Sequence, residues 1–184
     1  MSFHYWQYFL AIETSLIKTI QYVDLTPNNY KTYSIEFARI FLSASSEIDV
    51  ICKLLCEKID STKRAENIND YRNIITIKYP NFYSMKVLIP KYGIELTPWA
   101  KWENQKNPDW WKKYNNVKHE RNAHFQDANL KNNLDSVAGL FCLVLYYYQR
   151  ELYEFKLKPW TQLLSLENEP GYLLLETGYK LPDF

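Results

Sequence analysis

The chain has 184 residues and a formal net charge of +1. This length suits one domain with a substantial core, and the near-neutral charge gives no overall field that would attract nucleic acid or an anionic membrane. Binding of nucleic acid would therefore require a local basic patch. The chain has three cysteines, an odd number, and we see no secretion signal and no apolar run long enough to span a bilayer. We therefore expect a cytoplasmic protein without disulfides.

The first part of the chain predicts two long amphipathic helices. Apolar side chains recur at three- and four-residue spacing over residues 3–23, and Glu13 falls inside that apolar stripe. Ser34 is a good N-cap for a second helix that we expect to run to about Ile59, with Glu47 on the flank of its apolar stripe. Residues 60–73 are polar and charged, which predicts a loop with at most one helical turn.

The character of the chain changes after residue 74. Two short strands around a turn predict a β-hairpin insertion over residues 85–99. A helix is expected over 110–122, capped by Asp109, and a second over 127–155 whose middle is apolar nearly all round, as in a central, buried helix. Residues 159–184 read as an irregular tail, with a short strand or hairpin over 172–181.

These elements predict a single mainly α domain spanning residues 1–184. We expect an up-and-down helical bundle of four to five helices with a small β-hairpin insertion. The four glycines are isolated, so no glycine-rich phosphate loop is present, and no cluster of metal ligands is visible in the sequence. We therefore expect neither a nucleotide cofactor nor a metal.

Residues 110–125 combine two histidines, several cations and two adjacent tryptophans. Helical spacing places three polar side chains on one face: Asn115, His119 and Asn122. A second face carries two aromatic and two basic side chains: Trp111, Tyr114, Lys118 and Arg121. His119 and Arg121 diverge by about 200° on a regular helix, so both reach one substrate only if the helix unwinds near Glu120 or a second subunit supplies one of them.

These side chains suit cleavage of a phosphodiester bond. His119 can act as general acid or base, Lys118 or Arg121 can stabilise negative charge on the phosphate, and Asn115 can orient the imidazole. Without a metal, the nucleophile would be a ribose 2′-hydroxyl, which requires RNA. Substrate binding is assigned to four further residues, of which the aromatic ones would stack on bases: Trp111, Tyr114, Asn122 and His124.

A structural interpretation of the same residues is the alternative. Glu13 and Glu47 are the two carboxylates that intrude on apolar stripes, and buried acids are usually paired. Lys118 and Arg121 could be their partners. The Lys-His-x-Arg stretch would then be an ion-pair cluster in a non-catalytic interaction or scaffold module.

The chain also resembles the HEPN superfamily of all-α proteins, common in bacterial toxin–antitoxin and phage-defence systems. The similarity lies in Ser46-Glu47-Ile48-Asp49 with Lys53 on the second helix, and in the 114–121 stretch with its Tyr-Asn and Lys-His-x-Arg pattern, followed by a long apolar helix. The resemblance implies a dimeric, metal-independent endoribonuclease acting on single-stranded RNA, or an inactive relative in RNA binding or defence. Its implied partners are a second copy of the chain and a protein of the same defence operon.

Overall fold

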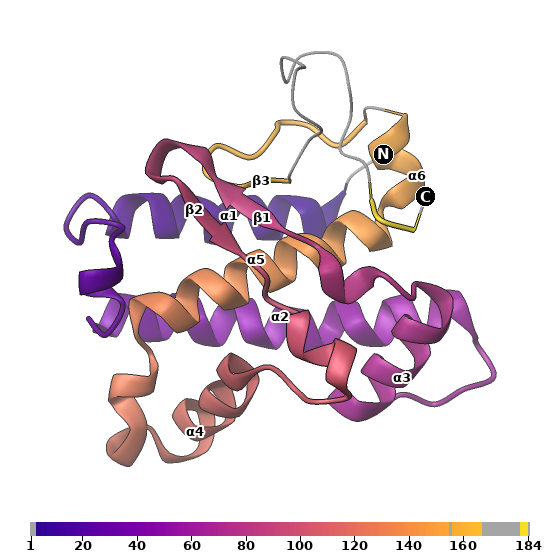
Figure 1. The fold of residues 1–184 in the computed structure, drawn as a ribbon, viewed down its shortest axis with the longest axis horizontal. Helices are drawn as coiled ribbons and strands as arrows, with labels where there is room; N and C mark the ends of the chain where they lie inside the picture. Colours follow the sequence, from indigo (N-terminus) through magenta and orange to yellow (C-terminus); the bar gives the residue numbers. More distant parts are fainter. Residues whose placement is uncertain (1–2, 155, 167–180, 184) are drawn as a thin grey trace.

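The computed structural model describes residues 3–154, 156–166 and 181–183. Within them the protein is mainly helical, with a small antiparallel sheet, which confirms the predicted fold class (Figure 1). The α-helices are α1 (His4–Thr19), α2 (Ile35–Ile59), α3 (Ile68–Lys78), α4 (Asp109–His124), α5 (Leu130–Tyr147) and α6 (Gln149–Tyr153). The strands are β1 (Val87–Ile89), β2 (Ile94–Leu96) and β3 (Ser165–Leu166).

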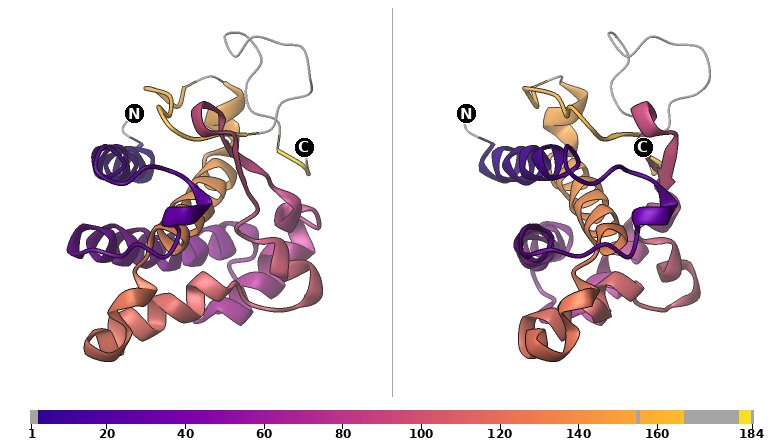
Figure 2. Two further views of the ribbon diagram at one scale, coloured as in Figure 1. Left: turned by 60° about the vertical axis from the view of Figure 1, so that its left-hand side comes forward. Right: turned by 90° about the vertical axis from the view of Figure 1, so that its left-hand side faces the viewer.

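Helix α2 occupies the middle of the molecule. It lies between α1 and α4, and its most extensive helix–helix contact is with α5 (Figures 1 and 2). Ser34 caps its first turn as predicted, since the Ser34 hydroxyl accepts a hydrogen bond from the backbone N–H of Phe37 at 3.0 Å. Asp49 and Lys53, which are one helical turn apart on α2, form an ion pair at 2.6 Å.

Helix α5 is the buried central helix that the sequence predicts, but it is shorter than expected. It begins at Leu130, after Asn129 caps it, and ends at Tyr147, with α6 as a separate short helix. All but a few of its side chains are buried, because α1, α2 and α4 pack around it. None of the described helices is long and apolar enough to cross a membrane.

The sheet contains the predicted hairpin and one additional strand. Its order is β2-β1-β3, and Val87 of β1 faces Leu96 on one side and Leu166 on the other. The third strand therefore comes from the tail at residues 165–166. The strand or hairpin predicted over 172–181 falls almost entirely outside the described residues.

The predicted loop over residues 60–73 is wrong in its second half, where α3 begins. The Asn67 side chain accepts hydrogen bonds from the backbone N–H groups of Asn69 and Asp70 and so caps the helix. Tyr71, Ile74 and Ile75 are buried. The helix is short and mostly polar, so packing against α2 stabilises it more than its own sequence pattern does.

A tryptophan cluster fixes the start of α4 on α5. The Trp99 indole N–H donates to the Gly139 carbonyl oxygen at 3.1 Å, and the Trp110 indole N–H donates to the Pro98 carbonyl oxygen at 3.0 Å. Gly139 permits this approach, because a Cβ atom there would lie 3.3 Å from the Trp110 ring. The beginning of the candidate site is thereby anchored in the core.

Candidate functional site

Helix α4 is regular in its first part and irregular at Glu120. Trp110, Trp111, Tyr114 and Val117 are buried, which holds the first two turns against the core. Glu120 has φ −136° and ψ 45°, far from helical values. After Val117 no apolar side chain of α4 is buried, so packing no longer enforces the helical path. The helix therefore unwinds near Glu120, which is one of the two arrangements expected to let His119 and Arg121 reach one substrate.

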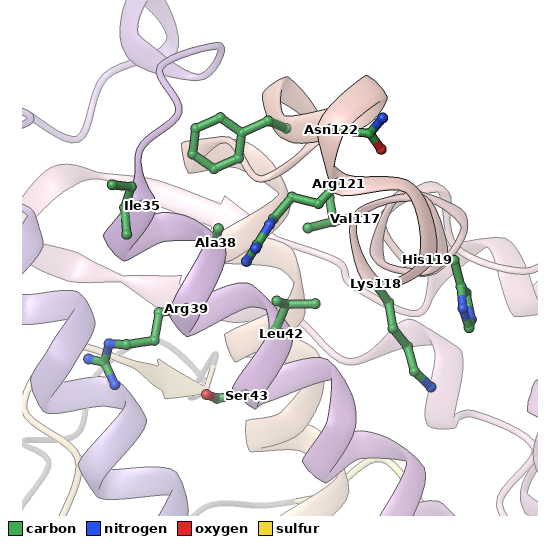
Figure 3. A pocket seen from close by; sticks show the side chains of 11 residues that line it. Ile35, Ala38, Arg39, Leu42, Ser43, Val117, Lys118, His119, Arg121 and Asn122 are labelled. Atoms are coloured by element: carbon green, nitrogen blue, oxygen red, sulfur yellow. The ribbon is translucent and has the colours of Figure 1, made fainter.

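A surface groove of about 1120 Å³ lies between α2 and the end of α4. Its floor is apolar and is formed by Ile35, Ala38, Leu42, Val117 and Phe125. Polar and basic side chains line the rest: Arg39, Ser43, Lys118, His119, Arg121 and Asn122 (Figure 3). Four predicted site residues are thus brought to one groove, namely Lys118, His119, Arg121 and Asn122.

The groove is basic. No aspartate or glutamate is among the described residues that line it. Within the described part of the chain, Lys118 and Arg121 form no ion pair, and the Lys118 ammonium instead lies 5.6 Å from the centre of the Tyr114 ring. Two uncompensated cations beside an apolar floor favour an anionic ligand that also carries an apolar or aromatic part.

His119 and Arg121 line the same groove but do not face each other. Figure 3 shows the Arg121 side chain directed toward α2 near Ala38 and Leu42, whereas His119 lies beyond Lys118 on the far side of α4. His119 is exposed. In a single copy of the chain, the imidazole and the guanidinium therefore contact different parts of a ligand.

Asp127 is the centre of a polar cluster near the unwound end of α4. It accepts hydrogen bonds from the Lys113 ammonium at 2.8 Å and the Asn116 side chain at 3.0 Å, and His124 Nδ1 lies 3.7 Å from it. Burial raises the pKa of Asp127, but the hydrogen bonds and the charge of Lys113 outweigh burial and hold that pKa below its ordinary value. The cluster joins both ends of α4 to the start of α5.

His124 belongs to this cluster rather than to the groove. Its Nε2 lies 3.6 Å from Glu120 and its Nδ1 faces Asp127, and it does not line the groove. The predicted role of His124 in substrate binding is therefore replaced by a structural one. An ion-pair cluster does exist in this stretch, but its lysine is Lys113, not Lys118.

Three other predicted site residues are also placed elsewhere. Asn115 donates a hydrogen bond to the Trp111 carbonyl oxygen at 3.0 Å and does not line the groove, so it cannot orient His119 from there. Trp111 and Tyr114 are 9% and 4% exposed and pack against each other. Neither ring offers an open face to a base, and the stacking prediction is wrong for both.

The two supporting carboxylates do not pair with the site cations. Glu13 is buried and accepts hydrogen bonds from the backbone N–H groups of Gln162, Leu163 and Leu164, at 3.0 to 3.1 Å. Glu47 is half-buried, has no cation partner among the described residues, and burial raises its pKa. The predicted pairing of Glu13 or Glu47 with Lys118 or Arg121 is wrong.

Arg39 is a groove residue that the sequence did not indicate. It lies on α2, and in the sequence it appears only as the partner of Glu36 three residues earlier, a common surface pair. Its place opposite α4 depends on how the two helices pack. The spacing of residues within one helix does not show which side chains of another helix lie opposite it.

Comparison with known proteins adds no relative: no family model, no curated protein and no solved structure matches the chain. Among the residues that the structure describes, no group of three or more histidine, cysteine, aspartate or glutamate side chains is arranged to hold a metal ion.

Proposed function

We propose that the protein is a HEPN-like RNA-binding protein and that the groove between α2 and α4 holds the backbone of single-stranded RNA. The observation that supports this most directly is that Lys118 and Arg121 lie at the edge of an apolar floor, without an ion-pair partner or an acidic lining residue among the residues that the structure describes. Lysine and arginine are the usual partners of phosphate, and arginine can contact two phosphate oxygens at once. The apolar floor suits ribose and base surfaces.

A double-stranded ligand fits this groove less well. Duplex RNA presents its phosphates on a wide cylinder and hides its base faces, whereas a single strand can place phosphates on the rim and bases on an apolar floor. Ile35, which is 82% exposed, extends that floor to the surface. The proposal is therefore specific to unpaired RNA.

Metal-independent cleavage is the second part of the proposal, and the unwinding at Glu120 favours it because His119 and Arg121 line one groove. His119 would take the proton from a ribose 2′-hydroxyl, whose oxygen attacks the adjacent phosphorus. The bond to the 5′-oxygen breaks, that oxygen takes a proton from water or a second acid, and a 2′,3′-cyclic phosphate remains. Arg121 would stabilise the added charge on the phosphate.

The orientation of His119 sets a condition for that chemistry. Because His119 does not face Arg121 within one copy, cleavage requires either a rotation of the His119 side chain or the apposition of two copies. A homodimer that pairs the ends of α4 would satisfy this condition. Binding by one copy has no such requirement.

Binding is tested with a labelled single-stranded oligoribonucleotide and a duplex of the same sequence, by fluorescence anisotropy at low salt. The double variant Lys118→Ala/Arg121→Ala should lose at least tenfold in affinity for the single strand. A matched control, Arg64→Ala/Lys78→Ala, removes one arginine and one lysine from exposed positions outside the groove. An equal loss of affinity in both double variants would refute the groove as the RNA-binding site.

Cleavage is tested separately, in EDTA, with an RNA whose 2′-hydroxyls are intact and one in which they are replaced by hydrogen. We expect cleavage of the first alone, ending in a cyclic phosphate, and its loss in His119→Ala with binding retained. Cleavage of the 2′-deoxy strand, or cleavage that survives His119→Ala, would exclude His119 as the acid–base group. Binding without any cleavage would leave RNA binding as the function.

A further inference from the structure

The geometry points to a second subsite on the other side of α2. We propose that the RNA strand continues from the α2–α4 groove across Arg39 and Ser43 and places one base against Tyr8 of α1. This inference rests on the proposed function, and it names the strand path and a base-binding residue that the α2–α4 groove does not contain.

Arg39 and Ser43 connect the two sides of α2. Both line the groove toward α4, and both also line a smaller pocket of about 150 Å³ between α1 and α2. The two hollows therefore share part of their walls rather than lying on separate faces of the molecule. A ligand in one can reach the other by passing over these two side chains.

Arg39 is held in position for an anion. Its Nε and Nη2 both donate to the Glu36 carboxylate, with Nε 2.9 Å from Oε2, and its Nη2 also lies 3.1 Å from Ser15 Oγ on α1. The hydrogen bond from Arg39 lowers the pKa of Glu36, so the pair stays ionised. These contacts use Nε and Nη2, and no described residue accepts a hydrogen bond from Nη1. A guanidinium fixed at two nitrogens with a third free can contact a phosphate without further loss of side-chain freedom.

The smaller pocket suits one flat ring. Its volume is well below that of pockets that hold drug-sized ligands, and its walls include Ala11, Ile12 and Ile40. Tyr8 lines it and is 47% exposed. The Tyr8 ring packs against no other aromatic ring of the described residues, unlike Trp111 and Tyr114. Because Tyr8 is about half exposed and lines the pocket, we expect its ring to be accessible to a stacking base.

The two subsites supply complementary chemistry. The α2–α4 groove offers cations over an apolar floor, whereas the α1–α2 pocket offers an aromatic face next to the Ser15 hydroxyl. Phosphate contacts with Arg39 between them would keep the backbone on the surface while the following base turns inward. This is the usual division in single-strand binding, where cations follow the backbone and aromatic side chains stack on bases.

The experiment compares a dinucleotide with an octanucleotide of the same base composition. Tyr8→Ala should weaken octanucleotide binding about tenfold, the loss expected for one stacked base, and leave dinucleotide binding within about twofold. Tyr8→Phe should bind as the wild type does. Tyr22→Ala, which removes a tyrosine that is 87% exposed and lies outside both pockets, is the control.

A second measurement uses the unaltered protein. With 4-thiouridine in the octanucleotide, ultraviolet cross-linking should yield a peptide from α1 that contains Tyr8, in addition to a peptide from α4. Cross-links to α4 alone, together with full octanucleotide affinity in Tyr8→Ala, would overturn the second subsite and leave the α2–α4 groove intact. Absence of any binding by the wild-type protein would refute both proposals.

Discussion

Lys113 Nζ lies 2.8 Å from Asp127 Oδ1, and this ion pair ties the second turn of α4 to the segment just before α5. The contact closes a loop around the unwound residue Glu120, since Asn116 and His124 reach the same carboxylate. The groove side chains Arg121 and Asn122 project from that loop. Asp127 therefore fixes the position of groove residues that it does not contact.

Asp127→Asn should lower the free energy of unfolding by about 1–2 kcal/mol at pH 7, because a charge-assisted pair with a half-exposed lysine is replaced by a neutral one. The folded-state pKa of Asp127 is lowered, so its stabilisation is complete above the unfolded-state pKa of about 3.9 and is lost as the pH falls through the folded value. Urea unfolding at pH 7, 5 and 3 should show the difference between variant and wild type shrinking at the lowest pH.

The control for this series is Asp24→Asn, since Asp24 is exposed and forms no ion pair with a described residue. It should change the free energy of unfolding by less than about 0.5 kcal/mol at each pH. A difference between Asp127→Asn and wild type that stays constant from pH 7 to pH 3 would contradict an ionised, paired Asp127.

Glu13→Ala should destabilise the protein by about 3 kcal/mol, because it leaves the buried backbone N–H groups of Leu163 and Leu164, and the part-buried N–H of Gln162, without an acceptor. Amide hydrogen exchange should accelerate at these three residues more than elsewhere. Glu57→Ala, at an exposed position of α2, is the control and should leave both quantities nearly unchanged. Retained protection at residues 162–164 in Glu13→Ala would show that other contacts fix this segment.

The helices were predictable where one apolar face repeats along a long element. The stripe of α2 with its Ser34 cap, and the apolar character of α5, were sufficient to place both, because burial of one face decides whether such helices form. The short helix α3 was not predicted from its apolar pattern. Its buried residues are few, and its stability comes from contact with α2, which no local pattern records.

The candidate site was predictable in part, for a related reason. The cations of α4 mark the groove, and helical phase named unwinding near Glu120 as one of two ways for His119 and Arg121 to reach one substrate; the backbone is non-helical at that residue. Phase alone could not show which side of α4 faces the core, so Trp111 and Tyr114 were expected on the surface. Pairings between distant residues, such as Glu13 with the backbone of residues 162–164, depend on tertiary packing and were assigned to the wrong partners.

Glu47→Gln should stabilise the protein at pH 7. Burial raises the pKa of Glu47 in the folded state, and no cation among the described residues offsets it, so ionisation at neutral pH carries a penalty that glutamine lacks. The penalty is complete above the folded-state pKa and vanishes below the unfolded-state value of about 4.3. Thermal unfolding should give a higher Tm for the variant at pH 7 and equal Tm values near pH 3.5. A Tm for Glu47→Gln that is lower at pH 7 would indicate a hydrogen bond that glutamine cannot replace.

The salt dependence of RNA binding offers a test that counts phosphate contacts. For single strands, each neutralised phosphate contributes about −0.7 to the slope of the logarithm of the binding constant against the logarithm of salt concentration. Contacts from the two unpaired cations, Lys118 and Arg121, should give a slope of about −1.4 in the wild type, since the charge of Arg39 is already balanced by Glu36. Lys118→Ala should reduce its magnitude to about 0.7, whereas Lys78→Ala, outside the groove, should leave it unchanged. Equal slopes for wild type and Lys118→Ala would mean that Lys118 does not contact phosphate, even if the variant binds more weakly.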